Sequence, residues 1–177
     1  MTNRQYGRPS PAAAGFTLVE MLVVLAIVAV LGGLILTAVN AARKRSQVNQ
    51  TKTIILQVEQ NLETYASDFH EYPPSDGEDG VKGNERMVEA LRTEEMNGPY
   101  LGAKEFYFKD VNNNGLKEIV DAWGRPLHYV HHRDYGREPP NKRTFRLYSA
   151  GYDGRFEPLN PDGDDIVNWN KSEADTE

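Results

Sequence analysis

The hydrophobic positions of this chain form two patterns, one continuous and one periodic. Residues 21–39 are nineteen residues without a charged side chain. In a helix with a rise of about 1.5 Å per residue, this run nearly spans the ~30 Å hydrocarbon core of a bilayer. Further along, apolar residues recur at steps of three and four, as on the buried face of a helix. These are Ile55, Val58, Leu62, Tyr65 and Phe69. The two patterns predict one helix from Phe16 to about His70.

The remaining pattern predicts a small α+β domain behind this helix. Pro73-Pro74 should end the helix, because proline disfavours helical backbone in the residue before it. Residues 76–83 are expected to form a loop and 85–92 a short helix with Met87, Val88 and Leu91 inward. Strands are predicted at 106–108, 127–131 and 144–148, the last two as a hairpin. We therefore expect a long N-terminal helix packed on a small antiparallel sheet.

A single acidic residue complicates the apolar run. Glu20 lies close to hydrocarbon, where a carboxylate costs ~2.5 kcal/mol or more unless it is protonated, reaches the interface or meets a cation. Residues 16–42 contain no Lys or Arg. Cleavage after Gly15 would create an α-amino group on Phe16, which a neighbouring copy could offer to Glu20. A secretory signal cut after Ala41 or Ala42, or an uncleaved anchor, is the alternative interpretation.

The segment Gly15-Phe16-Thr17-Leu18-Val19-Glu20 resembles the processing site of type IV prepilins and type II secretion pseudopilins. The resemblance implies that a prepilin peptidase cuts after Gly15 and methylates the new amino group of Phe16. It also implies that Glu20 guides filament assembly, and that the C-terminal domain lies in the periplasm. The expected parts are a leader (1–15), a transmembrane and assembly helix (16–42), the soluble half of the helix (43–75) and a globular domain (76–177).

The C-terminal segment contains an acidic cluster among glycines and prolines. Its carboxylates are Asp153, Asp162, Asp164 and Asp165. Such carboxylates repel one another unless a cation neutralises them, and hard oxygen ligands on an irregular loop suit calcium. A solvated acidic turn is the alternative.

Several motifs around this cluster resemble the major, G-type pseudopilin of type II secretion. They are Tyr148-Ser149-Ala150-Gly151 with Asp153-Gly154, then Asp165-Ile166 and Trp169, and Asp121-Ala122-Trp123-Gly124-Arg125-Pro126. The resemblance implies a pilin-like fold with calcium bound at the C-terminal loop. The implied side-chain ligands are Asp153, Asp164 and Asp165, with Asp162 as an alternative to Asp164.

A second loop, residues 110–121, has oxygen-bearing side chains at its first, third, fifth, ninth and twelfth places. They are Asp110, Asn112, Asn114, Glu118 and Asp121. Gly115 is sixth, where the sharp turn of an EF-hand-type loop requires glycine. This spacing resembles the calcium loop of dockerins and predicts a second metal site, although the last place holds Asp and not the usual Glu. The alternative is an Asn-Gly turn joining two strands.

Composition excludes several other classes. With no cysteine, the chain cannot be a disulfide-stapled scaffold, a thiol enzyme or a zinc ribbon. A net charge of −6 argues against nucleic acid as a partner. The sequence contains neither a Gly-x-Ser-x-Gly elbow nor a His-Glu-x-x-His motif. We therefore expect no enzymatic activity.

Taken with the resemblance, these features predict a structural subunit of a type II secretion pseudopilus, anchored once in the bacterial inner membrane. The expected partners are further copies of itself, prepilin peptidase, minor pseudopilins and the inner-membrane assembly platform. The second hypothesis is a type IV pilin or minor pilin for adhesion, motility or DNA uptake. Many such pilins close a C-terminal disulfide loop, which this chain cannot form.

Overall fold

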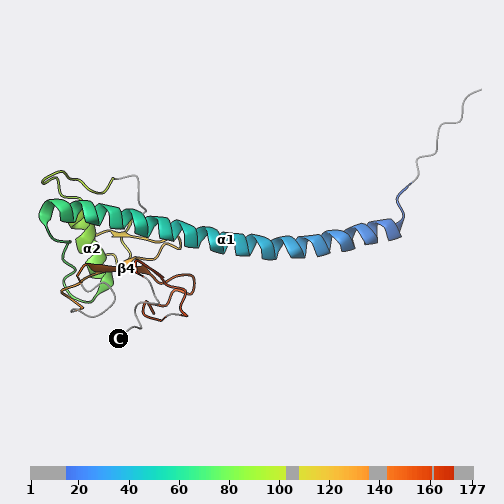
Figure 1. The fold of residues 1–177 in the computed structure, drawn as a ribbon. Helices are drawn as coiled ribbons and strands as arrows, with labels where there is room; N and C mark the ends of the chain where they lie inside the picture. The colour runs from blue at the N-terminus through green and yellow to red at the C-terminus, as the bar shows by residue number, and fades with distance from the viewer. Residues whose placement is uncertain (1–14, 103–107, 136–142, 161, 170–177) are drawn as a thin grey trace, which may run out of the picture. The chain divides into compact units, whose positions relative to one another are not determined.

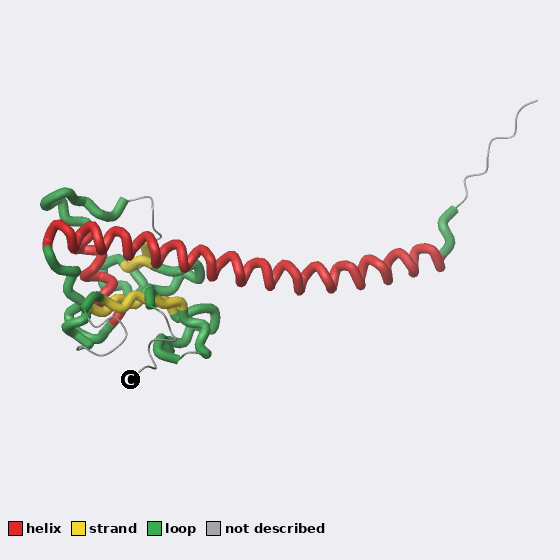
Figure 2. Tube along the Cα trace, viewed as in Figure 1, coloured by secondary structure: helices red, strands yellow, loops and turns green. Residues whose placement is uncertain are grey.

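The computed structural model describes residues 15–102, 108–135, 143–160 and 162–169 of the 177-residue chain. The chain divides into two compact units, residues 1–42 and 43–177. Its helices are α1 (Leu18–Phe69) and α2 (Gly80–Leu91) (Figure 1). Its strands are β1 (Phe108–Lys109), β2 (Glu118–Ile119), β3 (His128–His131), β4 (Phe145–Ser149) and β5 (Ile166–Val167). The predicted α+β class is confirmed, although the strands are short and loops make up much of the second unit (Figure 2).

The single long helix predicted from the two hydrophobic patterns is present. α1 is continuous over 52 residues and starts two residues after Phe16. It ends at Phe69, and His70 takes a left-handed backbone conformation with φ 61°. Within the described residues, α1 is the only helix long and apolar enough to cross a membrane. Residues 1–14 of the predicted leader lie outside the described residues.

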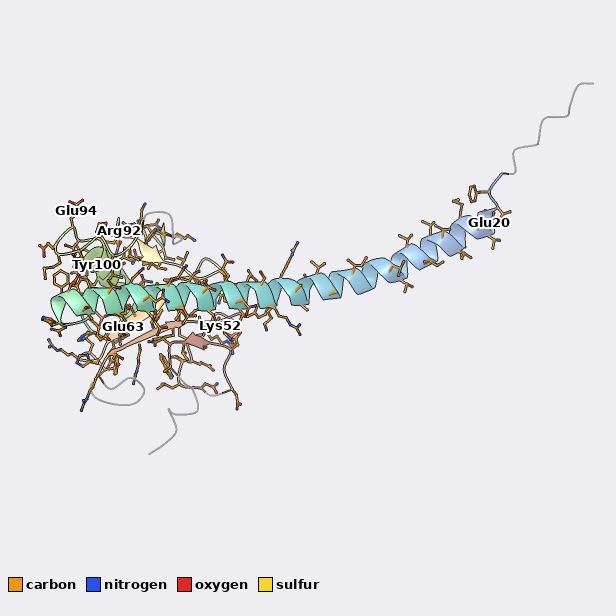
Figure 3. All side chains as sticks on the ribbon, turned by 45° about the horizontal axis from the view of Figure 1, so that its top comes forward. Glu20, Lys52, Glu63, Arg92, Glu94 and Tyr100 are labelled. Carbon is orange, nitrogen blue, oxygen red and sulfur yellow. The ribbon has the colours of Figure 1, made fainter. Side chains whose placement is uncertain are left out.

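The core of the second unit forms where the periodic stripe of α1 meets α2 and the strands. Val58 and Leu62 are fully buried, and Ile55 is nearly so. Their neighbours in the core include Met87, Val88, Leu91, Leu127, Tyr129, Phe145 and Leu147. The stripe ends in Tyr65 and Phe69, whose rings stack at 4.4 Å and meet Tyr100 edge-on. Figure 3 shows Tyr100 beside this end of α1.

The strands form two separate antiparallel sheets. β1 pairs with β2, so that Phe108 lies opposite Ile119. In the second sheet β4 lies between β3 and β5, with His131 opposite Phe145 and Ser149 opposite Ile166. The predicted hairpin of β3 and β4 is confirmed within one residue at each end. Of the predicted strand 106–108, residues 106 and 107 lie outside the described residues.

The prediction for α2 was wrong at its start, because residues 80–83 were assigned to a loop. Asp79 caps the helix, and its carboxylate accepts hydrogen bonds from the backbone N–H groups of Val81 and Lys82. A Cβ atom on Gly83 would lie 1.9 Å from the carbonyl oxygen of Tyr129. The glycine that suggested a loop is therefore needed for the close approach of α2 to β3.

Asn84 connects α2 to two strands through the core. Its side chain is fully buried. Nδ2 donates to the carbonyl oxygens of Ile119 (2.9 Å) and Leu127 (2.7 Å), while Oδ1 accepts from the N–H of Ile119 (3.0 Å). One amide thus satisfies three buried backbone groups of short strands that have few ladder bonds of their own.

Replacement of Asn84 by alanine should lower the free energy of unfolding by about 3 kcal/mol. The N–H of Ile119 and the carbonyl of Leu127 lose their partners inside the core, while the carbonyl of Ile119 keeps the N–H of Leu127. Urea unfolding of the full-length protein in mild detergent measures the change. The matched control is Asn97→Ala, since exposed Asn97 bonds the carboxylate of Asp68 near the surface and should cost under about 0.5 kcal/mol. Equal losses in the two variants would contradict the role given to Asn84.

His128 is held against the aromatic ring of Phe156, with ring centroids 3.5 Å apart. A Cβ atom on Gly80 would lie 2.6 Å from the same imidazole, so the start of α2 lies directly against the His128 ring. Burial lowers the pKa of His128 to about 4, and the charge of Asp79 opposes this shift only in part. The folded state therefore favours a neutral His128 at neutral pH.

The domain should lose stability as the pH falls from 7 to 5. At pH 5 the unfolded chain, with an ordinary His pKa of about 6.5, binds a proton that folded His128 does not bind. This difference lowers the free energy of unfolding by about 2 kcal/mol at pH 5. His131, whose pKa burial also lowers, adds in the same direction. His128→Phe, which keeps the stacking, should reduce this pH dependence in thermal unfolding. His70→Asn removes an exposed imidazole and should leave it intact.

Candidate assembly terminus and calcium loops

The predicted processing and assembly residues surround the first turn of α1. Gly15, Phe16 and Thr17 are exposed and precede the helix. The N–H and hydroxyl of Thr17 donate to Oε2 of Glu20 at 2.8 and 2.9 Å, and the hydroxyl oxygen accepts from the N–H of Glu20. Figure 3 shows Glu20 at the start of α1.

This reciprocal pair is a capping box, in which Thr17 is the N-cap and Glu20 the third helical residue. Sequence analysis treated Glu20 only as a charge in an apolar run. The spacing Thr-x-x-Glu before the helix was the signal for this second role. Glu20 therefore closes the helix end within one chain, and its other carboxylate oxygen has no bond to Thr17.

The C-terminal loop folds back on itself at Asp164. Oδ2 of Asp164 accepts hydrogen bonds from the N–H groups of Tyr152 (2.7 Å) and Asp153 (3.2 Å). Gly151 has φ 62°, and a Cβ atom there would lie 2.3 Å from the carbonyl oxygen of Asp164. The sequence motif around Gly151 therefore permits two segments of the acidic cluster to touch.

The other predicted ligands take different positions in this loop. Asp165 is buried, and its Oδ2 accepts from the N–H of Glu157 at 3.1 Å. Asp153 is exposed and its Oδ1 accepts from the N–H of Arg155. Asp162 is exposed, and its N–H donates to Oδ1 of Asn160. The structure thus places Asp153 directly against Asp164, with Asp165 next in the chain.

Arg125 joins this loop to the motif at residues 121–126. Its guanidinium donates from Nη1 to the carbonyl of Gly151 (2.9 Å) and from Nη2 to that of Tyr152 (3.1 Å). Asp121 shapes the motif, because its Oδ1 accepts from the N–H groups of Trp123 and Arg125. Its Oδ2 accepts the hydroxyl of Ser149 at 2.7 Å in β4. Sequence analysis missed this structural role of the motif.

The chemistry of the C-terminal donors suits calcium, which prefers carboxylate and carbonyl oxygens. Asp153, Asp164 and Asp165 each have one carboxylate oxygen bonded to backbone N–H groups. Within the described ranges, no three His, Asp or Glu side chains gather closely enough to hold a metal ion. Calcium at this loop therefore stays a prediction.

The second predicted loop curls around Asp110. Its Oδ1 accepts from the N–H of Asn114 at 3.1 Å and its Oδ2 from that of Gly115 at 2.9 Å. Asn112 accepts from the same N–H of Asn114 through Oδ1. Gly115 has φ 89°, so glycine at the sixth place serves the turn that the spacing predicted.

Glu118 points into this loop, and Glu85 of α2 joins it from outside. Fully buried Glu118 accepts the N–H of Val111 through Oε2 at 3.0 Å. The side-chain amides of Asn112 and Asn114 both donate to Oε1 of Glu85, at 2.7 and 2.8 Å. Burial raises the pKa of the Glu118 carboxyl, and Glu85 adds a smaller contribution in the same direction.

Four of the five predicted loop residues are thus brought together, while both oxygens of the fifth, Asp121, are bonded to the 121–125 turn and to Ser149. Sequence analysis missed Glu85, because it precedes the loop on a separate helix and no local spacing relates the two.

Two family models match consecutive parts of the chain. The first, described as the prokaryotic N-terminal methylation motif, covers residues 11–36. The second, described as type II secretion system (T2SS), protein G, covers residues 38–169. Together they include the capping box at Glu20, the acidic loops and the 121–126 motif.

Curated relatives agree with the second match over nearly their whole length. Type II secretion system core protein G of Pseudomonas aeruginosa is 30% identical over 158 residues, which are 88% of this chain and 94% of that protein. The core protein G of Escherichia coli is 28% identical over 165 residues, 93% of this chain and 97% of that protein. That of Vibrio cholerae is 27% identical over 157 residues, 88% and 91% of the two chains. The chain therefore belongs to the type II secretion system protein G family and is a structural subunit of a pseudopilus, a pseudopilin.

Proposed function

We propose that this pseudopilin works mechanically and has no enzymatic activity. The first part of α1 stores each copy in the inner membrane, with the domain of residues 43–177 in the periplasm. Copies then leave the membrane and stack into a short filament that drives export of proteins across the outer membrane. The observation that carries this proposal is the unbroken α1, which exposes apolar side chains such as Leu25 in one unit and supplies the buried stripe of the other.

The proposed maturation step is cleavage after Gly15 by prepilin peptidase, followed by methylation of the amino group of Phe16. Two observations support it. The bond lies in exposed, non-helical chain before α1, where a peptidase can reach it. The methylation-motif match spans this bond. Minor pseudopilins and the inner-membrane assembly platform are the further partners that we propose.

Assembly would use the charge that maturation creates. The amino group of Phe16 in one copy pairs with the carboxylate of Glu20 in the next, and methylation leaves the amine charged. Thr17 donates to only one oxygen of Glu20, so the second remains for the incoming amine. The pairing relieves a carboxylate that would otherwise lie near lipid at a cost of ~2.5 kcal/mol or more.

Glu20→Gln should abolish assembly without unfolding the protein. Glutamine preserves the capping box and removes only the charge. We expect a strain that lacks this pseudopilin to regain secretion with the wild-type chain and to stay at least tenfold lower with Glu20→Gln. Val24→Cys, which adds the one cysteine of this otherwise cysteine-free chain, should give crosslinked dimers only with Glu20 intact.

The control is Glu94→Gln, which removes an exposed carboxylate from the second unit and should support normal secretion. Thermal unfolding of the purified variants should be unchanged. Normal secretion in the deletion strain, together with loss of surface fibres, would instead favour the alternative function of a type IV pilin or minor pilin.

The C-terminal loop is the proposed calcium site of this subunit. Asp153, Asp164 and Asp165 would supply carboxylate oxygens, with loop carbonyls completing the shell and Asp162 as the alternative to Asp164. The contact of Asp164 with the backbone of residues 152–153 supports this assignment, because it already joins the two acidic segments. Calcium would hold the loop at the end of the second sheet, because β5 begins directly after Asp165.

Calcium at 100 times its dissociation constant should raise the free energy of unfolding by ~2.7 kcal/mol for this site. Asp165→Asn should abolish that gain, since asparagine keeps an oxygen acceptor for the N–H of Glu157 and loses the charge. Thermal unfolding of the full-length protein in calcium and in chelator measures both. Glu78→Gln, at an exposed acid outside the loop, should respond as wild type. An unaltered calcium response in Asp165→Asn would refute the ligand set.

A further inference from the structure

One carboxylate oxygen in the core of the second unit has no hydrogen-bond partner. It is Oε1 of Glu118, a residue without exposed surface. The second oxygen, Oε2, accepts the N–H of Val111, which directs the carboxyl group into the loop that begins at Asp110. A buried carboxylate oxygen without a partner is costly, so its position requires an explanation.

A second acidic side chain, Glu85, faces the same place from α2. Glu85 is only 7% exposed. Within the described part of the chain, no Lys, Arg or His forms an ion pair with Glu85 or Glu118. Arg92, the C-cap residue of α2, places its guanidinium over the ring of Phe108 instead. Two buried acids therefore adjoin without a basic partner.

The groups between these two acids are neutral oxygen carriers. Asn112 and Asn114 direct their amides to Glu85, each with a bond under 3 Å. Rotation of an amide by half a turn exchanges its nitrogen for its oxygen in the same position. The N–H of Asn114 keeps Asp110 as an acceptor in either orientation. A half-turn of both amides would present oxygens where the loop now presents N–H donors, at the cost of the bond from the N–H of Leu116 to Oδ1 of Asn114 at 2.8 Å.

We propose that this cluster is a second calcium site, formed by Glu85 of α2 with Asp110, Asn112, Asn114 and Glu118 of the loop. It differs from the site expected from sequence spacing in that Glu85 replaces Asp121. Two buried carboxylates, two amides and Asp110 supply hard oxygens of the kind and number that calcium takes. Amide oxygens have to carry part of the shell, because among the described residues Glu85, Asp110 and Glu118 do not by themselves gather into a metal-holding group of three acids.

The cluster borders a cavity through Glu85. This cavity of ≈ 300 Å³ is lined by Glu85 and by Gly115 and Leu116 of the loop. Arg92, Lys117 and Glu89 line the same cavity, so its walls carry charges of both signs. Calcium would cross-link α2 to the loop between β1 and β2, so this site stabilises a different part of the domain from the C-terminal loop.

Calorimetric titration of the full-length protein in mild detergent with calcium chloride tests this site. We expect two ions per wild-type chain and one for each of Glu85→Gln, Glu118→Gln and Asp165→Asn. The double variant with both Glu118→Gln and Asp165→Asn should bind no calcium ion. Glu78→Gln, at an exposed acid outside both loops, and Asp121→Asn should each retain two ions.

Thermal unfolding shows whether a lost ion reflects a lost site or a damaged fold. In chelator, Glu118→Gln should unfold at or above the wild-type temperature, because the substitution removes a buried, unpaired acid. In calcium, this variant should lose about half of the wild-type rise in unfolding temperature. One ion per wild-type chain that disappears in Asp165→Asn, or two ions retained by both Glu85→Gln and Glu118→Gln, would overturn the proposal.

Discussion

The hydrogen-bond ladder of α1 is the constraint on which the rest of this molecule depends. A helix satisfies its own backbone groups, so it is the one element that can pass from water into hydrocarbon without a partner strand. The same 52-residue helix must also supply a stripe of buried side chains to the core of the second unit. The side chains alone change between these tasks, from uninterrupted apolar residues at 21–39 to the spaced positions of Val58 and Leu62.

The soluble unit compensates for its short strands with side chains that bond to backbone. Asn84 holds β2 and the residue before β3, while Asp121 holds the turn after β2 and reaches Ser149 in β4. The hydroxyl of Tyr129 donates to the carbonyl of Pro73 at 2.6 Å, which ties β3 to the chain just after α1. These bonds connect short strands that form few backbone hydrogen bonds with one another. Polar residues in the core thus determine where the sheets lie.

Sequence reasoning succeeded where the signal was periodic and failed where it depended on contacts between distant segments. Spacing predicted α1 and the β3–β4 hairpin, because both follow from repeated apolar positions. It misread residues 80–83, since the need for Gly83 comes from Tyr129 and cannot be seen locally. Within the predicted loop, hydrogen bonds link Asp110 and Asn112 to the backbone of Asn114, and Glu118 accepts from the N–H of Val111. The loop spacing could not reveal Glu85, nor the turn that engages Asp121, because both depend on tertiary contacts.

The capping box at the start of α1 has a consequence for maturation. Both of its members, Thr17 and Glu20, lie on the C-terminal side of the Gly15–Phe16 bond. A chain shortened at that bond would keep the N-cap at the start of its helix. The first turn would therefore not fray, and its backbone N–H groups would keep their acceptors. Proteolysis would then change the charge at the terminus and leave the structure of the first helical turn unchanged. Removal of the proposed leader would therefore leave a helix whose first turn is already capped by its own side chains.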